Sequence, residues 1–264
     1  MSTGQTAGTG RAAGTGQPAS TGQPVAAPRQ AATVLLLRDD PFQVLMVRRR
    51  QGGTFSNALV FPGGVIDAAD ADAAWLPHLA GASDLAPEAR ALRVGALRET
   101  FEEASILVAR LPDGSPLPPG PPNDGSPFRE LVARRGAVLA LDELHPFGRW
   151  VTPVVEPRRF DATFFVCRAP DGQLARQDDG ETVGFEWARP AELVERAAAG
   201  ERSLLFPTLM NLRRLAESAD AESAITSADA RPLVTVSPTA RVENGRTVLT
   251  IPEDSGYGAT EHVP

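Results

Sequence analysis

The most informative part of the chain is residues 97–106, with the sequence Leu-Arg-Glu-Thr-Phe-Glu-Glu-Ala-Ser-Ile. At about 100° per residue, apolar side chains recur on one narrow stripe of a helix drawn through this stretch. A proline at position 87 suits the first turn of that helix, so we predict a helix over residues 87–104. The stripe that it turns toward the core consists of Val94, Leu97, Phe101 and Ala104.

Three carboxylates fall on the opposite side of this predicted helix, within another arc of about 100°. They are Glu99, Glu102 and Glu103, and positions three and four apart are neighbours on a helix surface. Such a cluster repels itself unless a cation lies within it, and hard divalent cations such as Mg²⁺ prefer oxygen ligands. For the helix alone, a solvated acidic face is an equally good interpretation.

Residues 61–67, Phe-Pro-Gly-Gly-Val-Ile-Asp, favour the metal interpretation. A Gly-Gly turn lets the backbone approach a ligand closely and can offer a carbonyl oxygen to a metal ion. Together the two stretches resemble the Nudix box, in which a glycine and an acidic residue precede an Arg-Glu-x-x-Glu-Glu helix. Gly64, Asp70 and the Arg98–Glu103 stretch match that pattern. The resemblance implies a Nudix hydrolase: an α/β/α sandwich with a mixed sheet that splits a nucleoside-linked diphosphate with Mg²⁺ or Mn²⁺.

The sequence departs from the usual box at three points. Residues 71–97 put 27 residues between Asp70 and Arg98, where seven are usual. Lengthening the loop this much costs only about 1 kcal/mol of closure entropy. We therefore expect an insertion at about residues 71–87 that lies outside the catalytic core and shapes the mouth of the pocket. Thr100 replaces a bulky apolar residue, and Ser105 replaces the final glycine, which predicts a differently formed helix end.

The interrupted box resembles one branch of the family in particular, the branch of the peroxisomal coenzyme A diphosphatases of animals. Further matches are residues 149–153, 157–165, 187, 190 and 207–208, so the resemblance covers roughly residues 30–215. It implies hydrolysis of coenzyme A or acyl-coenzyme A to 3′,5′-ADP and (acyl-)phosphopantetheine. Two alternatives stay open. One is a Nudix hydrolase of NADH, ADP-ribose, a dinucleotide polyphosphate or capped RNA, and the other is a non-catalytic nucleotide-binding regulator.

The resemblance also implies roles for single residues. Glu102 and Glu103 are the expected direct metal ligands, and the carbonyl of Gly64 is a further one. Glu99 is expected to bind the metal through water or to act as the general base. Arg98 is expected to orient a neighbouring carboxylate, because a guanidinium grips a carboxylate in fixed geometry.

Other candidate residues lie outside the box. Glu181 lies six residues before Trp187, where many Nudix enzymes carry a catalytic carboxylate; otherwise it is an exposed loop glutamate. Arg158 and Arg159 could bind substrate phosphates or form an ordinary surface pair. Arg48 lies upstream of the Phe-Pro-Gly-Gly turn, where coenzyme A-cleaving relatives have an arginine.

Composition sets the broader limits. The chain has 264 residues, of which 42% are hydrophobic and 22% charged, as in soluble globular proteins. A net charge of −7 makes nucleic acid an unexpected partner. With one cysteine, Cys167, and no apolar leader or membrane-length segment, we expect a cytoplasmic protein that acts on a small nucleotide substrate. All its basic residues are arginine, which suggests GC-rich, bacterial DNA.

The expected organisation has three parts. Residues 1–30 are rich in Gly, Thr, Gln and Pro and are expected to be a disordered tail. A Nudix domain should follow over residues 31–218, with a proline-rich surface loop at 112–127. A C-terminal extension over 219–264 should contain a β-hairpin that turns at the Asn-Gly pair. Strands are expected at 32–37, 43–47, 59–61, 106–108, 150–155, 163–167 and 182–187, and further helices at 128–135, 191–199 and 208–219.

Overall fold

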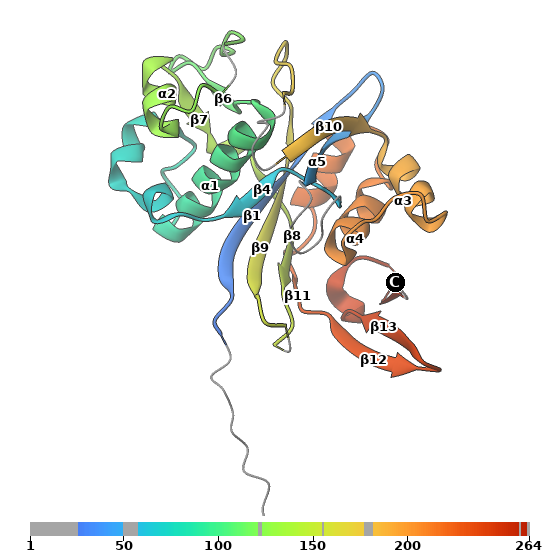
Figure 1. The fold of residues 1–264 in the computed structure, drawn as a ribbon. Coiled ribbons are helices and arrows are strands. Elements are labelled where there is room, and N and C mark those ends of the chain that lie inside the picture. The colour runs from blue at the N-terminus through green and yellow to red at the C-terminus, as the bar shows by residue number, and fades with distance from the viewer. Residues whose placement is uncertain are drawn as a thin grey trace, which may run out of the picture.

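A mixed β-sheet forms the centre of the protein (Figure 1). The computed structural model describes residues 26–49, 58–120, 123–154, 156–176, 182–258 and 260–262, so most of the predicted N-terminal tail lies outside it. In space the strands follow the order β10–β2–β1–β9–β8–β11, with β3 paired to β2 and β4 to β1. Their bounds are β1 Arg29–Arg38, β2 Gln43–Arg49, β3 Leu59–Val60, β4 Gly63–Val65, β8 His145–Val151, β9 Phe160–Arg168, β10 Thr182–Ala188 and β11 Thr235–Val236.

The pairing of β1 with β9 holds the middle of this sheet together. The two strands run parallel in unbroken register from Arg29 opposite Phe160 to Leu37 opposite Arg168. The partners β2 and β8 join antiparallel on either side. This mixture of directions is the mixed sheet that the resemblance implied.

Helices cover both faces of the sheet, as the continuous apolar run of β1 requires, because successive side chains of a strand point to opposite faces. Val34 and Leu36 pack on the face that carries α1 (Pro87–Ala104) and α2 (Phe128–Arg134). Leu35 and Leu37 point to the other face, which carries α3 (Pro190–Ala198), α4 (Phe206–Leu215) and α5 (Ala221–Asp229). Figure 1 shows the two groups of helices on opposite sides of the sheet, so the predicted α/β/α sandwich is confirmed.

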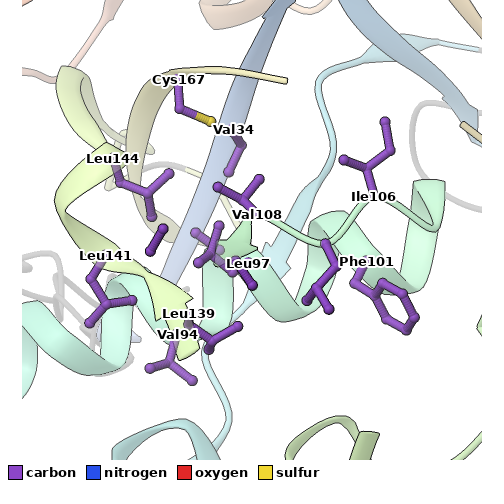
Figure 2. Packing of buried hydrophobic residues seen from close by; sticks show 14 of the residues in the cluster. Val34, Val94, Leu97, Phe101, Ile106, Val108, Leu139, Leu141, Leu144 and Cys167 are labelled. Atoms are coloured by element: carbon purple, nitrogen blue, oxygen red, sulfur yellow. The ribbon is translucent and has the colours of Figure 1, made fainter. Parts of the chain in front are cut away.

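Helix α1 packs on the sheet through the predicted stripe. Val94, Leu97, Phe101 and Ala104 are all buried, and the helix begins at the predicted proline. Figure 2 shows Leu97 and Val94 among Leu139, Leu141 and Val108, with Phe101 and Ile106 in another part of the same cluster. Burying an apolar side chain of this size contributes about 1.5–3 kcal/mol, so this stripe fixes the side of α1 that faces away from the core.

The insertion after Asp70 packs on the hydrophobic core through Trp75, while its expected place outside the catalytic core, at the mouth of the pocket, stays a prediction. Residues 68–80, which lead into it and form its first part, make two short 3₁₀ helices, η1 (Ala68–Ala71) and η2 (Ala73–His78), followed by β5 (Leu79–Ala80). Trp75 is buried and packs against Phe128 of α2, with ring centroids 5.6 Å apart. β5 joins a small sheet with β7 (Val138–Ala140) and β6 (Ala109–Arg110).

The C-terminal residues continue the fold. α5 packs against the sheet, and Tyr257 is buried with its hydroxyl 2.9 Å from the indole nitrogen of Trp150. The predicted hairpin is present as β12 (Thr239–Glu243) and β13 (Arg246–Thr250), with Asn244 and Gly245 both at positive φ; β14 (Glu261–His262) pairs with β13. The remaining 3₁₀ turns are η3 (Leu141–Glu143) and η4 (Glu253–Ser255).

Several predicted boundaries were wrong. The apolar run 106–108 is buried loop, and the strand follows it at Ala109–Arg110. β8 begins at His145, several residues before the predicted strand, and the helix predicted over 208–219 ends at Leu215. None of the helices in the described part of the chain has the length and apolar character needed to cross a lipid bilayer.

Candidate active site

The Phe-Pro-Gly-Gly turn and α1 meet through Glu103. β4 pairs with the start of β1, which places Gly63 and Gly64 beside the helix. The backbone N–H of Gly63 donates a hydrogen bond to Oε2 of Glu103 at 2.9 Å, and Glu103 is only 5% exposed. The two halves of the interrupted box therefore touch at a buried carboxylate.

Gly64 makes room for a second carboxylate. A Cβ atom at position 64 would collide with the Glu99 carboxylate group. Gly95 of α1, one turn before Glu99, makes room for Asp70 in the same way. A Cβ atom at position 95 would lie 2.8 Å from Oδ2 of Asp70. These close approaches explain why the site has glycine where the turn and the helix face each other.

Arg98 lies at the centre of the cluster, and all five of its N–H groups donate hydrogen bonds. Nε and Nη2 bind the two oxygens of Asp70 at 2.9 and 3.0 Å, and Nη2 also binds the Val65 carbonyl at 3.0 Å. Nη1 binds Glu99 at 2.8 Å and Glu102 at 2.9 Å. Asp70 is buried, so the residue that anchors this arginine lies immediately before the insertion.

The charges of the cluster shift the titration of its members. Burial lowers the pKa of Arg98, but the bond to Asp70 and the charges of Glu99 and Glu102 outweigh it and hold that pKa above its usual value. Burial raises the pKa of Glu102, and Arg98 offsets part of the rise. The site thus concentrates more negative charge than its arginine neutralises.

Two departures from the box keep the local geometry. Thr100 is fully buried, and its hydroxyl donates to the carbonyl of Ala96 at 2.8 Å, so its polar atom has a partner in the core. Ser105 adopts the left-handed conformation (φ 56°, ψ 23°) that a glycine would adopt, and its N–H donates to the carbonyl of Phe101. The expectation of a different helix end was therefore wrong, because a serine can take this conformation at a modest cost.

The carboxylates open onto a pocket of about 450 Å³. One part of its lining is Asp67, Arg98, Glu99, Glu102 and Glu103. The other part comes from the end of the proline-rich loop and from two aromatic residues, namely Asn123, Gly125, Ser126, Phe101 and Phe128. The sequence indicated only a surface loop here, because its proline content says nothing about what the loop faces.

The donor set of this pocket fits a divalent cation. Asp67, Glu99, Glu102 and Glu103 line it, and oxygen donors are what Mg²⁺ and Mn²⁺ prefer. Arg98 lies between Glu99 and Glu102, and no three His, Cys, Asp or Glu side chains of the described residues are gathered around one ion position. The carboxylate oxygens, and the space that the missing side chain of Gly64 leaves beside them, fit such an ion. Arg98 holds the carboxylates in place.

The other candidate residues do not line this pocket, as far as the structure describes the chain. Arg48 is half-buried on β2, opposite Leu59. Arg158 is exposed in the turn between β8 and β9. Arg159 donates to the carbonyls of Thr152 and Ala26. Glu181 lies outside the described residues.

Comparison with known proteins agrees with this geometry. A family model described as the NUDT19 Nudix domain matches residues 78–215. The chain is 30% identical over 243 residues to human acyl-coenzyme A diphosphatase NUDT19, with 73% of this chain and 62% of the human protein covered. It is 31% identical over 201 residues to putative nudix hydrolase 7 of Caenorhabditis elegans, with the same coverage. The match thus spans about three fifths of the length of either relative.

A solved structure shares the fold at similar identity. The crystal structure of a NUDIX hydrolase from Alicyclobacillus acidocaldarius superposes with a TM-score of 0.66 and 29% identity. The match covers 78% of this chain and 99% of the other. The two curated relatives are animal proteins, so they do not support the expected bacterial source.

Proposed function

The chain belongs to the NUDT19-type Nudix family, and on this premise we propose that it hydrolyses coenzyme A or acyl-coenzyme A at the diphosphate. The products are 3′,5′-ADP and (acyl-)phosphopantetheine. The observation that carries the proposal is the cluster of carboxylates that Arg98 holds at an open pocket. The name of the human relative, an acyl-coenzyme A diphosphatase, supports the substrate class.

The roles of the residues follow from charge and position. Glu102, Glu103 and the carbonyl of Gly64 would hold Mg²⁺ or Mn²⁺, with Glu99 beside them. When bound, such an ion neutralises the diphosphate and orients the attacking water. Glu99, whose carboxylate lies close to the backbone of Gly64, would accept the proton of the attacking water. Arg98 keeps Glu99 and Glu102 in position through Nη1.

Arginines outside the pocket are proposed for the phosphates that remote parts of the substrate carry. Arg158 is exposed, and a guanidinium can bind the 3′-phosphate of coenzyme A in bidentate geometry. Arg159 and Arg48 are further candidates on the same chemical grounds. Glu181 stays a predicted catalytic carboxylate.

A substrate panel tests the proposal. The protein is incubated with Mg²⁺ or Mn²⁺ and coenzyme A, acetyl-coenzyme A, NADH, ADP-ribose or diadenosine polyphosphates, and products are identified by mass. We expect 3′,5′-ADP from the two coenzyme A compounds, with ¹⁸O from labelled water in one monophosphate product. Removal of divalent ions with EDTA should abolish the reaction.

Two results would contradict the proposal in different ways. Cleavage of ADP-ribose or NADH with coenzyme A left intact would keep the hydrolase and replace its substrate. No cleavage of any compound would favour capped RNA or a regulatory role. Comparison of coenzyme A with its form lacking the 3′-phosphate tests whether the arginines bind that phosphate. If they do, loss of the charged contact should lower kcat/KM roughly ten- to a hundredfold.

A further inference from the structure

The end of the proline-rich loop lines the same pocket as the carboxylates. Asn123, Gly125 and Ser126 contribute to the lining, while Phe128, which follows them, starts α2. We call residues 123–126 the polar wall. The box does not include it, and it lies after the helix that holds the carboxylates.

Two contacts with α1 fix the polar wall at its ends. At one end the N–H of Asn123 donates to the hydroxyl of Ser105 at 3.4 Å. At the other end Phe128 packs on Phe101 of α1, with ring centroids 5.7 Å apart and planes 32° apart. Because Phe101 and Ser105 flank Glu102 and Glu103 in the sequence, both contacts tie the wall to the helix turn that holds the carboxylates.

Hydrogen bonds inside the polar wall set its shape. The side-chain oxygen of Asn123 accepts from the N–H of Gly125 at 3.0 Å, and Asp124 accepts from the N–H of Ser126 at 3.0 Å. Arg134 pairs with Asp124 at 3.0 Å, so that charge is balanced away from the pocket. The side-chain nitrogen of Asn123 makes no hydrogen bond within the described residues, and it is a donor that a ligand can use.

These observations concern a position where the usual residue is glycine. Glycine takes the left-handed conformation freely, whereas serine takes it at a cost. The Ser105 hydroxyl makes a contact that glycine cannot make. On the assumption that the proposed function holds, we propose that Ser105 is a positioning residue, which fixes the polar wall so that Asn123 binds an uncharged hydrogen-bonding group of the substrate, such as an amide.

The charges of the pocket determine this choice of ligand group. Its lining carries four carboxylates, and Arg98, its cation among the described lining residues, already uses all five donors. A phosphate at the wall would find no free arginine there. A hydrocarbon chain would leave the Asn123 amide without a partner, which costs about 1–3 kcal/mol when it is buried.

The test compares Ser105→Gly and Asn123→Ala with the wild type. Asn244→Gly is the matched control, because Asn244 is another non-glycine residue at positive φ (49°), in the distant C-terminal hairpin. With coenzyme A and dephospho-coenzyme A, we expect Ser105→Gly and Asn123→Ala to raise KM about fivefold for both compounds. Their kcat should stay within about twofold, and Asn244→Gly should change neither constant.

Hydrogen exchange provides a readout that needs no turnover. Amides of residues 123–126 should exchange about fivefold faster in Ser105→Gly than in the wild type or in Asn244→Gly. Saturating coenzyme A without divalent ions should slow their exchange in the wild type.

Each contrary outcome overturns a specific part of the proposal. An unchanged KM, or no protection of residues 123–126 by coenzyme A, would overturn the polar wall as a binding site. A loss confined to coenzyme A would mean that the wall holds the 3′-phosphate, and a fall in kcat alone would mean that the wall supports the carboxylates. If the wild type cleaves neither compound, the proposed function fails, and the exchange measurements decide on the wall.

Discussion

Arg98 and Arg214 are both nearly buried, yet the protein surrounds them in opposite ways. Arg98 is enclosed by carboxylates, with ion pairs to Asp70, Glu99 and Glu102. Arg214 of α4 is 8% exposed and makes no ion pair with the described residues. Its guanidinium donates to the Phe147 carbonyl at 2.9 Å and lies over the rings of Phe147 and Tyr257.

The different surroundings of the two arginines give their pKa values opposite shifts. Burial lowers the pKa of Arg214, as expected where aromatic rings and one carbonyl replace water, whereas the carboxylates hold the pKa of Arg98 above its usual value. The further carboxylates around Arg98 belong to the proposed site, and three substitutions test that proposal.

The largest expected effect comes from Glu102→Gln. This change keeps the volume of the side chain and removes a charge that does not hold the fold together, since the Glu102 side chain is 42% exposed. We expect hydrolysis to fall about a thousandfold, or about 4 kcal/mol of transition-state stabilisation, with a melting temperature within a few degrees of the wild type. Steady-state kinetics and calorimetry measure the two quantities.

Glu88→Gln is the matched control, because Glu88 lies exposed at the other end of α1. It should leave turnover unchanged. Near-wild-type turnover in Glu102→Gln would remove the reason to treat the Arg98 cluster as a metal site.

Arg98→Met should produce the next largest effect, this time on stability. It leaves the Asp70 carboxylate, whose side chain is 1% exposed, without its ion-pair partner, and breaking a buried pair costs about 3 kcal/mol or more. The free energy of unfolding in urea measures the loss. The double variant with Asp70→Asn should lose less than the sum of the single variants, because both remove the same pair. Strict additivity would show that the two residues do not stabilise each other.

Arg214→Met should have the smallest effect. Methionine fills much of the space, and the change removes one hydrogen bond and contacts with two rings, so we expect a loss of about 1–2 kcal/mol. The kcat and KM of folded protein should match the wild type. A large change in kcat or KM would mean that Arg214 also contributes to the active site and is not only a packing residue.

The parts of the fold that were predictable from the sequence have local causes. The stripe of α1, its start at Pro87 and the Asn-Gly hairpin each depend on a few neighbouring residues, and all three were confirmed. The sandwich followed from the resemblance and from the mixture of strands and helices. The carboxylates of the box could be named in advance because their spacing on the helix is fixed.

The remaining features depend on contacts between distant residues. Helix α5 was not predicted, because its short, alanine- and serine-rich sequence has few apolar residues and is stabilised by packing on β8 and β9. The polar wall was missed because its place depends on Ser105 and Phe101, far from it in sequence. The insertion's part in the core rests on the contact of Trp75 with Phe128.

The position of β1 in the middle of the sheet governs when the protein can fold during its synthesis. Gln30 of β1 pairs with Asp161 of β9, which lies 131 residues later in the chain. The other residues of β1 pair with β9 at the same separation. At about 5–20 residues per second, the ribosome needs roughly 7–26 s to make that intervening chain. Throughout this time β1 can pair with β2 but has an apolar edge without its partner. The nascent chain thus carries an exposed strand until β9 emerges, and chaperones that shield such edges should bind it within this interval.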